Sequence, residues 1–468
     1  MSKIKSLVLG SAAAIVAIGG AQAADLPVKA KAVEYVKVCS LYGAGFYYIP
    51  GTDTCIRIGG YLRAEVTIGG APSDATYLNG DGGINLRTAG QYQTRARIMM
   101  NVDTRTATEY GVVRTFAAFG PQFNEGATNA PPDTLGSGSM RVEAAFVQFA
   151  GFTIGRSSSA YALPWNGAPG NINSTLMGGP NFDAGVNNIQ YTWQFGNGVS
   201  ASVGVDQQGY SNRTGVLNAS LALPSATTGS YTNEYAAPTS VDIVGNLRLD
   251  QAWGLIQFSA AAHQVTGSYY SLTTAGAPSD VTIGHPSDKW GFAVTGALQL
   301  KNLPTGPGDD IKISATYTEG ALRYVLGQSG NTPLNFAALD GTSLALATIA
   351  DGVYANGTGI ELTKAWGLNG AFNHNWNRNW SSSIFGSYSK VDYNGTVEAA
   401  ARYNPDFAVS QLGLSTTWKP VKDLAFIAEG TWVHIDQNQV GAVTLQGRPV
   451  TYGDADRFSG ILRVQRNF

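Results

Sequence analysis

Residues 189–205 read IQYTWQFGNGVSASVGV, two runs of alternating side chains on either side of a Gly-Asn-Gly turn. Before the turn at residues 196–198, apolar and aromatic side chains alternate with Gln and Thr; after it, Val and Ala alternate with Ser and Gly. Successive side chains of a β-strand point to opposite faces. The alternation therefore predicts two strands joined by a tight turn, each with one apolar and one polar face.

The same alternation recurs through the chain. Residues 56–68 place Ile, Leu and Val on one face and Arg57, Arg63 and Glu65 on the other. We count about sixteen such segments, each near the roughly 9 to 11 residues that a tilted membrane strand requires. Further examples are residues 241–249, 290–300, 311–318, 407–418 and 424–434, whereas 108–119 and 152–160 do not divide cleanly into two faces.

The connectors between these segments alternate in length. Short connectors at residues 196–198, 251–254 and 419–423 follow every second segment, and long ones such as 207–239 and 322–358 follow the others. Short turns on one rim and long loops on the other are typical of a membrane barrel. We therefore predict an all-β fold, a transmembrane antiparallel up-and-down β-barrel of about 16 strands.

A secreted soluble all-β protein is the alternative, since alternation also places one face on a core. The outer face of such a protein is rich in Lys and Glu, whereas the polar face here is mostly Gln, Ser, Thr and Asn. Aromatic residues also gather towards segment ends, as at Trp193, Trp290 and Trp418, which matches the aromatic girdle at a membrane interface. Both features favour the barrel.

The N-terminus and the composition indicate export. Residues 1–23 contain two lysines, an apolar run and the small residues of a cleavage site, the pattern of a signal peptide. Charged residues are only 13% and glycines number 58, which departs from ordinary soluble proteins. The net charge of −2 offers no basic patch for nucleic acid. We expect a periplasmic segment at 24–54 and the barrel at 55–468.

A barrel of this size implies passage of solutes. About sixteen strands leave an interior too wide for side chains to fill, so the polar strand faces would line water. The connector at residues 161–188, which follows the fifth strand, is long and contains Gly and Pro, and we expect it to fold inward and narrow the pore. Its one acidic residue is Asp183.

Charged residues of the N-terminal third would face this connector. Opposed charges across a water-filled constriction would order water and set a field through which a solute passes. Alternatively, these side chains only satisfy hydrogen bonds inside the barrel or pair between strands. The candidate pore-lining residues are Arg63, Glu65, Arg95, Arg97, Arg141 and Glu143, with Arg57 and Arg87 on the same strand faces.

No motif indicates catalysis or a bound metal. The four histidines are widely spaced, without a close pair or an HExxH motif. The sequence also contains no GxSxG, no P-loop and no GxGxxG before a helix. We expect neither an enzyme nor a cofactor.

The two cysteines of the chain, Cys39 and Cys55, lie just before the first strand. The periplasm is oxidising, so we predict that they form a disulfide. Closing so small a loop contributes on the order of 3 kcal/mol when the bond restricts the unfolded chain. A redox site is disfavoured because the spacing is not CxxC. The bridge would pin the start of the first strand, where a slip of one residue would turn Arg57 and Glu65 towards lipid.

The two ends of the chain resemble a known family. The segment EYVKVCSLYGAGFYYIPGTDTCIRIGGYLR at 34–63, preceded by AADLPVKAKAVEYVK and matched by the closing RFSGILRVQRNF, is similar to porins of alphaproteobacteria of the Rhizobiales and Brucella type. The resemblance implies a homotrimeric sixteen-stranded barrel in the outer membrane of a Gram-negative cell, in contact with its lipid, whose third loop folds inward.

The resemblance also implies passive diffusion of small hydrophilic solutes and ions. Terminal Phe468 would belong to the signal read by the barrel-insertion machinery, although Arg466 stands where another hydrophobic residue is expected. Two functions stay open: a general diffusion porin, and a substrate-selective channel with a sugar or anion site in the lumen. A role of the loops as an adhesin or phage receptor is compatible with either.

Overall fold

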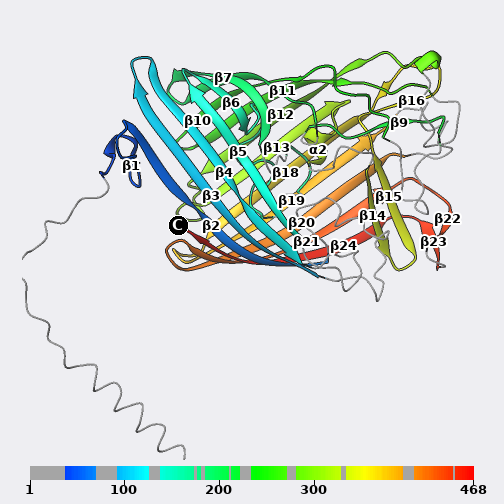
Figure 1. The fold of residues 1–468 in the computed structure, drawn as a ribbon. Helices are drawn as coiled ribbons and strands as arrows, with labels where there is room; N and C mark the ends of the chain where they lie inside the picture. Colours follow the sequence, from blue (N-terminus) through cyan, green and yellow to red (C-terminus); the bar gives the residue numbers. More distant parts are fainter. Residues whose placement is uncertain are drawn as a thin grey trace, which may run out of the picture.

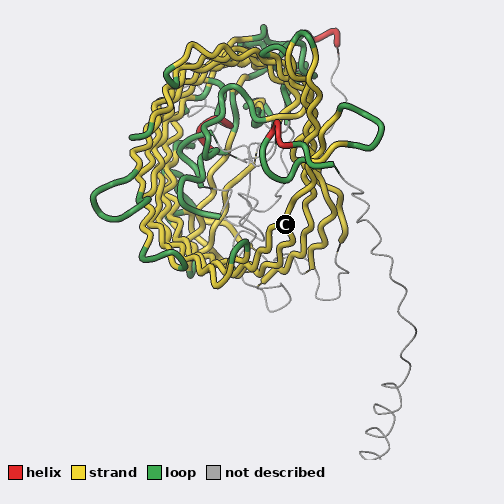
Figure 2. The backbone as a smooth tube through the Cα atoms, turned by 90° about the vertical axis from the view of Figure 1, so that its left-hand side faces the viewer, coloured by secondary structure: helices red, strands yellow, loops and turns green. Residues whose placement is uncertain are grey.

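Sixteen antiparallel strands close into one barrel in this computed structural model (Figures 1 and 2). The ring closes because β2 (Thr54–Ile68) pairs with both β3 (Tyr92–Thr108) and the last strand, β24 (Ala455–Asn467). The predicted fold class is confirmed. The structure describes residues 37–69, 92–125, 137–172, 176–180, 185–209, 212–221, 233–270, 281–327, 334–393, 405–445 and 448–468.

The remaining strands of the ring follow one another in chain order, each paired with its neighbours. They are β4 (Gly111–Glu125), β5 (Ser137–Phe149), β6 (Phe152–Ser157), β7 (Val186–Gly196), β8 (Val199–Asp206), β10 (Asp242–Gln251), β11 (Gly254–Val265), β12 (Lys289–Lys301), β13 (Asp310–Glu319), β18 (Lys364–Asn375), β19 (Trp380–Asp392), β20 (Phe407–Val421) and β21 (Leu424–Gln437).

Short elements lie at the two ends of the barrel (Figure 1). At the end with the short turns, the N-terminal segment contributes η1 (Ser40–Tyr42) and β1 (Tyr47–Tyr48). The remaining short elements lie in the long connectors. These are β9 (Val216–Asn218), η3 (Val281–Ile283), α2 (Arg323–Leu326), β14 (Leu334–Asp340), β15 (Ser343–Ile349), β16 (Gly352–Tyr354), β17 (Glu361–Leu362), β22 (Ala442–Leu445) and β23 (Arg448–Tyr452).

The turn at residues 196–198 shows why short connectors close these hairpins. Asn197 and Gly198 have φ angles of 49° and 75°. Positive φ at both central residues is what a two-residue hairpin turn with the right-handed twist of the strands requires, and Asn-Gly tolerates it well. The predicted tight turn is confirmed.

The predicted division of each strand into two faces is also confirmed. On β2, Ile58 and Leu62 are 60% and 55% exposed on the outside, whereas Glu65 is only 7% exposed on the inner face. Residues 108–119 resisted this interpretation because Phe116 faces inward, beneath the Arg114 guanidinium at 5.2 Å, while Thr115 faces outward with its hydroxyl bonded to Thr104.

Aromatic side chains form the expected exposed belt at the strand ends. Trp193 lies near the end of β7, Trp290 near the start of β12 and Trp418 near the end of β20, and all three are exposed. Trp418 stacks on Trp380 of β19 with ring centroids 5.8 Å apart. Among the described residues, no helix has the length and apolar character needed to cross a membrane.

Candidate functional site

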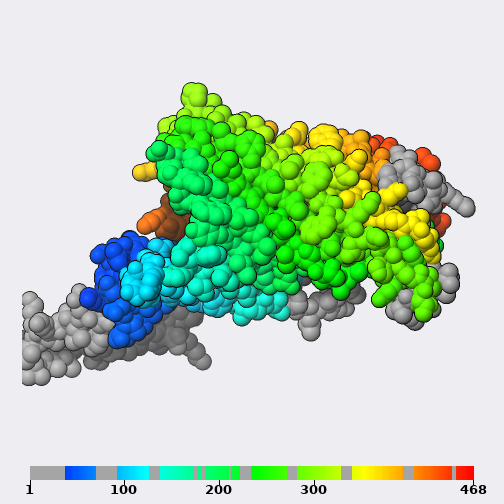
Figure 3. All heavy atoms as spheres, turned by 90° about the horizontal axis from the view of Figure 1, so that it is seen from above, coloured from blue at the N-terminus to red at the C-terminus, as the bar shows by residue number. Residues whose placement is uncertain are grey.

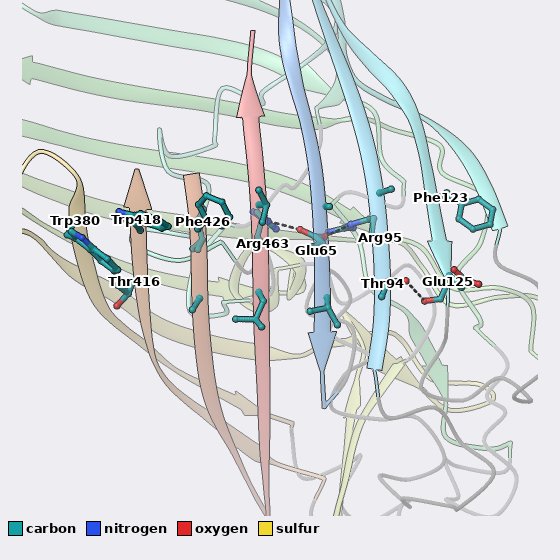
Figure 4. A pocket seen from close by; sticks show the side chains of 17 residues that line it. Glu65, Thr94, Arg95, Phe123, Glu125, Trp380, Thr416, Trp418, Phe426 and Arg463 are labelled. Atoms are coloured by element: carbon teal, nitrogen blue, oxygen red, sulfur yellow. Dashed lines mark hydrogen bonds and ion pairs between the residues drawn. The ribbon is translucent and has the colours of Figure 1, made fainter. Parts of the chain in front are cut away.

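Glu65 is the centre of an ion network on the inner wall. It lies opposite Arg95 on one side and Arg463 on the other, because β2 pairs with β3 and β24 in that register. Arg95 donates to Glu65 Oε1, and the Nε of Arg463 donates to Oε2 at 2.6 Å. Figure 4 shows the three side chains in a row across the strands. The Glu65 side chain is only 3% exposed, so this carboxylate is neutralised on both sides.

A second network continues along the wall to β5. Arg97 donates from Nη1 to Glu143 at 3.2 Å and from Nε to Gln122 at 2.9 Å. Arg141 lies 3.5 Å from the same Glu143 carboxylate. Arg141 and Glu143 are two residues apart on β5 and therefore share its inner face, next to the point where the register with β4 shifts at Ala118.

The structure therefore brings six of the predicted residues onto one continuous surface. We call it the arginine wall: five arginines against two glutamates, which leaves excess positive charge. Asp183 and Arg87 lie outside the described residues. The members of the wall are Arg63, Glu65, Arg95, Arg97, Arg141, Glu143 and Arg463.

Sequence reasoning missed Arg463. Its signal was the alternation of residues 457–468, which places Arg463 on the polar face of the last strand. Only ring closure, however, brings Arg463 beside Glu65, 398 positions away in the chain. Arg63 is also tied to β24, through a 3.0 Å bond from its Nε to Gln465.

Three more arginines converge on Asp103 nearer the short-turn end. Arg57, Arg105 and Arg114 place guanidinium nitrogens 3.6, 3.2 and 3.0 Å from one carboxylate oxygen of Asp103, whose side chain is 2% exposed. The N-terminal segment covers this cluster, since Arg57 and Arg105 lie 5.0 and 4.9 Å from the ring centroid of Phe46.

The disulfide Cys39–Cys55 holds that N-terminal segment in place. Its Cα atoms are 6.1 Å apart, and both cysteines are almost fully buried against Phe46. In Figure 3 the N-terminal segment, blue, lies against the cyan β3–β4 end of the barrel. The predicted bridge is present in the structure.

Phe468 extends the pairing between the last strand, β24, and the first strand, β2. Its backbone N–H and C=O both bond to Gly60 at 3.0 Å, which continues the β24–β2 ladder by one residue. The Phe468 side chain is 61% exposed.

The connector between β6 and β7 folds inward in its described parts, residues 158–172, 176–180 and 185, and we call it the inner loop. It begins and ends three residues earlier than the predicted 161–188, because β7 already starts at Val186. Loops crossing the inside of the ring are visible in Figure 2. Side chains of β11 and β13, on the side of the barrel opposite the arginine wall, hold the inner loop. Gln257 donates to Ala162 O at 2.9 Å, and Lys312 donates to Pro169 O at 3.0 Å.

Further along the inner loop, two side chains of β20 and β21 accept backbone N–H groups. Gln411 accepts from Met177 N and Glu429 accepts from Ile172 N, both at 2.7 Å. These bonds run from β11 round to β21, so the middle of the inner loop lies against that side of the barrel. Of its described residues, only the last, Gly185, bonds to the backbone of Glu143 on β5, at 2.9 Å, and the arginine wall faces the remaining space.

The described ranges offer no candidate metal site. They contain no group of three or more His, Cys, Asp or Glu side chains able to hold a metal ion. Six of the seven charged side chains of the arginine wall are paired in ion networks, and Arg63 is hydrogen-bonded to Gln465. Together they carry an excess of positive charge.

A closed barrel with an apolar outside and a polar inside is the architecture of integral outer-membrane proteins, and this chain has both features. The sequence profile of the family described as Porin subfamily matches residues 25–461. The chain belongs to this porin family, and it is a multi-pass β-barrel of the outer membrane.

Individual relatives agree with this assignment. The chain is 36% identical over 264 residues to porin Omp2b of Brucella abortus and to porin Omp2b of Brucella melitensis. Each alignment covers 54% of this chain and 64% of the relative, so the chain spans somewhat less than two thirds of these curated proteins.

The fold is similar to that of a solved structure. It is the outer membrane channel DcaP of Acinetobacter baumannii, with a TM-score of 0.61 at 14% sequence identity, covering 90% of this chain and 99% of that one.

Proposed function

We propose that this chain forms a water-filled channel for passive diffusion of small hydrophilic solutes and ions across the outer membrane. The observation that carries the proposal is the inner loop, bonded to one side of a closed barrel and leaving the arginine wall to face the lumen. Polar side chains along such a path exchange hydrogen bonds with water and solutes, and no catalytic group takes part.

The mature protein starts at Ala24 in this proposal, after removal of residues 1–23. Residues 24–54 lie on the periplasmic side, together with the short turns, and Phe468 is part of the signal for the insertion machinery. The functional unit is a homotrimer, as the resemblance to alphaproteobacterial porins implies.

The test is single-channel recording of the purified protein in a planar bilayer. We expect stepwise increases in conductance that scale with salt concentration. Liposomes containing the protein should also swell in isotonic solutions of small sugars. Protein that inserts, resists proteolysis as a barrel and yet conducts no ions would contradict the proposal.

A second candidate is a channel with an anion site in the lumen. The excess of arginines over glutamates on the arginine wall favours it, since guanidinium groups bind carboxylate and phosphate well. A polyvalent anion such as citrate should then block the current in a saturable, concentration-dependent way. A current that only scales with ion mobility would favour the general porin.

A further inference from the structure

A second loop also enters the barrel, and its interior is apolar. It joins β13 to β18, and its described residues are 320–327 and 334–363. Its side chains at Leu322, Val325 and Ile349 are completely buried. They belong to one cluster with inner-face residues at the long-loop ends of the barrel strands: Val391 of β19, Phe407 and Val409 of β20, Val433 and Ile435 of β21, and Ala455 of β24.

Inner-face positions of a water-filled barrel are normally wet, so these residues need a reason to be apolar. Val409 and Val433 are both 0% exposed in the structure. Removing such apolar side chains from water is favourable. The inner face of β19–β21 at the long-loop end therefore packs against the second loop and does not line water.

The second loop also contacts the inner loop directly. Gly178 of the inner loop donates its N–H to Val325 O at 2.8 Å, and the neighbouring Met177 is part of the same apolar cluster. Gly178 has a φ of 88°, and an added Cβ would lie 2.1 Å from Leu368 O of β18. This close approach to β18 requires glycine. The two loops therefore contact each other and the inner face of the barrel at the same place.

A buried polar cluster connects the second loop to β10 and β11 of the barrel. Asp351, 0% exposed, accepts hydrogen bonds from Leu322 N at 2.7 Å and from Thr214 N at 2.8 Å. Its Oδ2 lies 3.7 Å from His263 Nε2, and His263 Nδ1 bonds to Asp242 Oδ1 at 2.7 Å. We call Asp351, His263 and Asp242 the latch.

Other groups enclose the latch. Tyr324 of α2 donates to Asp242 at 2.8 Å, and the Tyr235 hydroxyl is 2.8 Å from His263 Nε2. Arg213 stacks on Tyr235 at 4.6 Å, and Asp206 of β8 is also buried nearby. The carboxylates and the imidazole of the latch satisfy one another, and such a buried group holds one geometry because breaking one contact leaves the others unpaired in an apolar surrounding.

We propose that the 320–363 loop is a second constriction element of the channel. Held by the latch, it closes the β18–β21 side of the long-loop mouth and confines solutes to the path along the arginine wall. The proposal rests on the proposed channel function. Asp351 is a positioning residue in it, acting on pore size through the loop.

The first experiment compares single-channel conductance of wild type and Asp351→Ala. Without the Asp351 carboxylate, the second loop loses its bonds at Leu322 N and Thr214 N, and we expect a conductance at least about 1.5-fold higher with added current noise. The matched control is Asp340→Ala, because Asp340 is an exposed acid of the same loop and should leave the conductance unchanged.

The second experiment measures the reaction of an introduced cysteine with a charged thiol reagent. Val409→Cys lies under the second loop and should react at least about 100-fold more slowly than Ser139→Cys, which is exposed on the inner face of β5, since a buried thiol reacts only after local opening. Adding Asp351→Ala should speed the reaction at position 409.

The outcomes separate the two proposals. A wild type without channels overturns the channel function itself. A conducting wild type whose conductance Asp351→Ala leaves unchanged, or in which Val409→Cys reacts as fast as Ser139→Cys, overturns the second constriction. If Asp351→Ala does not fold, the reaction rate of Val409→Cys in the otherwise wild-type barrel decides.

Discussion

Each glutamate of the arginine wall has two arginine partners. One arginine of each pair can therefore be replaced without leaving the glutamate unpaired. Glu65 contacts both Arg95 and Arg463, and Glu143 contacts both Arg97 and Arg141. Removing one arginine from each pair leaves every carboxylate paired. Variants of the wall therefore report on the lumen field and not on misfolding.

The double variant Arg95→Ala, Arg97→Ala should shift ion selectivity towards cations. Two of the five positive charges disappear, so the potential along the path becomes less favourable for anions. The measurement is the reversal potential in a salt gradient. Lys390→Ala is the control, because Lys390 is paired with Asp392 on the outer side of β19. An unchanged reversal potential in the double variant would remove these two residues from the constriction.

Asp309, in the short connector between β12 and β13, predicts a local pH dependence. Burial by itself raises the pKa of Asp309, but hydrogen bonds from Asn375 N, Thr305 Oγ1 and His374 outweigh it and hold the pKa at about 2. A lowered pKa means that the carboxylate stabilises the turn at every pH above its ordinary value near 3.9, and that this stabilisation is lost as the pH falls towards 2.

Amide hydrogen exchange at Asn375 should therefore stay slow down to about pH 4, after correction for intrinsic rates, and speed up below it. Asp309→Asn should show fast exchange already at pH 6. Equal exchange in both proteins at pH 6 would contradict the role of this carboxylate.

At the scale of elements, the disulfide matters because β2 extends beyond its neighbour. β24 reaches only as far as Gly60, where Phe468 pairs, so the start of β2 has a free edge. β1 covers that edge by pairing Tyr47 with Ile56 and Tyr48 with Cys55. A strand of two residues cannot hold itself there, and the Cys39–Cys55 bridge supplies the missing constraint.

Replacing both cysteines by serine should lower the free energy of unfolding by about 3 kcal/mol, the amount expected for a closed loop of this length. Urea unfolding in detergent micelles measures the change. Conductance should stay the same, since the bridge lies behind Phe46, away from the arginine wall. A non-reducing mass that reveals two free thiols in the wild type would refute the bridge.

On the scale of the whole molecule, the proposed homotrimer predicts the way in which the channels close. Three equivalent barrels in one assembly should close in three equal steps under high voltage, because each pore gates independently. Single-channel traces of protein extracted in mild detergent measure this. Closure in a single step, together with a monomer mass under the same conditions, would contradict the trimer.

Much of the architecture was predictable because barrel strands are local in sequence. The alternation at residues 56–68 or 189–205 needs no partner to be recognised, and a short turn such as Asn197-Gly198 joins neighbours within a few residues. The inward faces of Arg63, Glu65, Arg95, Arg97 and Arg141 follow from the same period. Alternation does not give the register between strands. The pairing of Arg463 with Glu65 was therefore missed.

The long loops were less predictable. From the sequence, residues 322–358 were predicted only as a long connector. In the structure, three of its apolar side chains form a core with residues of β20 and β21: Leu322, Val325 and Ile349 with Val409 and Val433. Nothing periodic marks such a loop, and its partners come from strands far along the chain.

The sequence alone determined that this protein is a barrel with a polar interior, because a period of two residues sorts side chains between lipid and water wherever a strand forms. The tertiary structure alone decided where the path through that interior lies. Glu65 meets Arg463 only when the first and last strands pair, and two loops occupy one side of the lumen only through contacts between distant segments, the apolar cluster and the bonds at Asp351 among them.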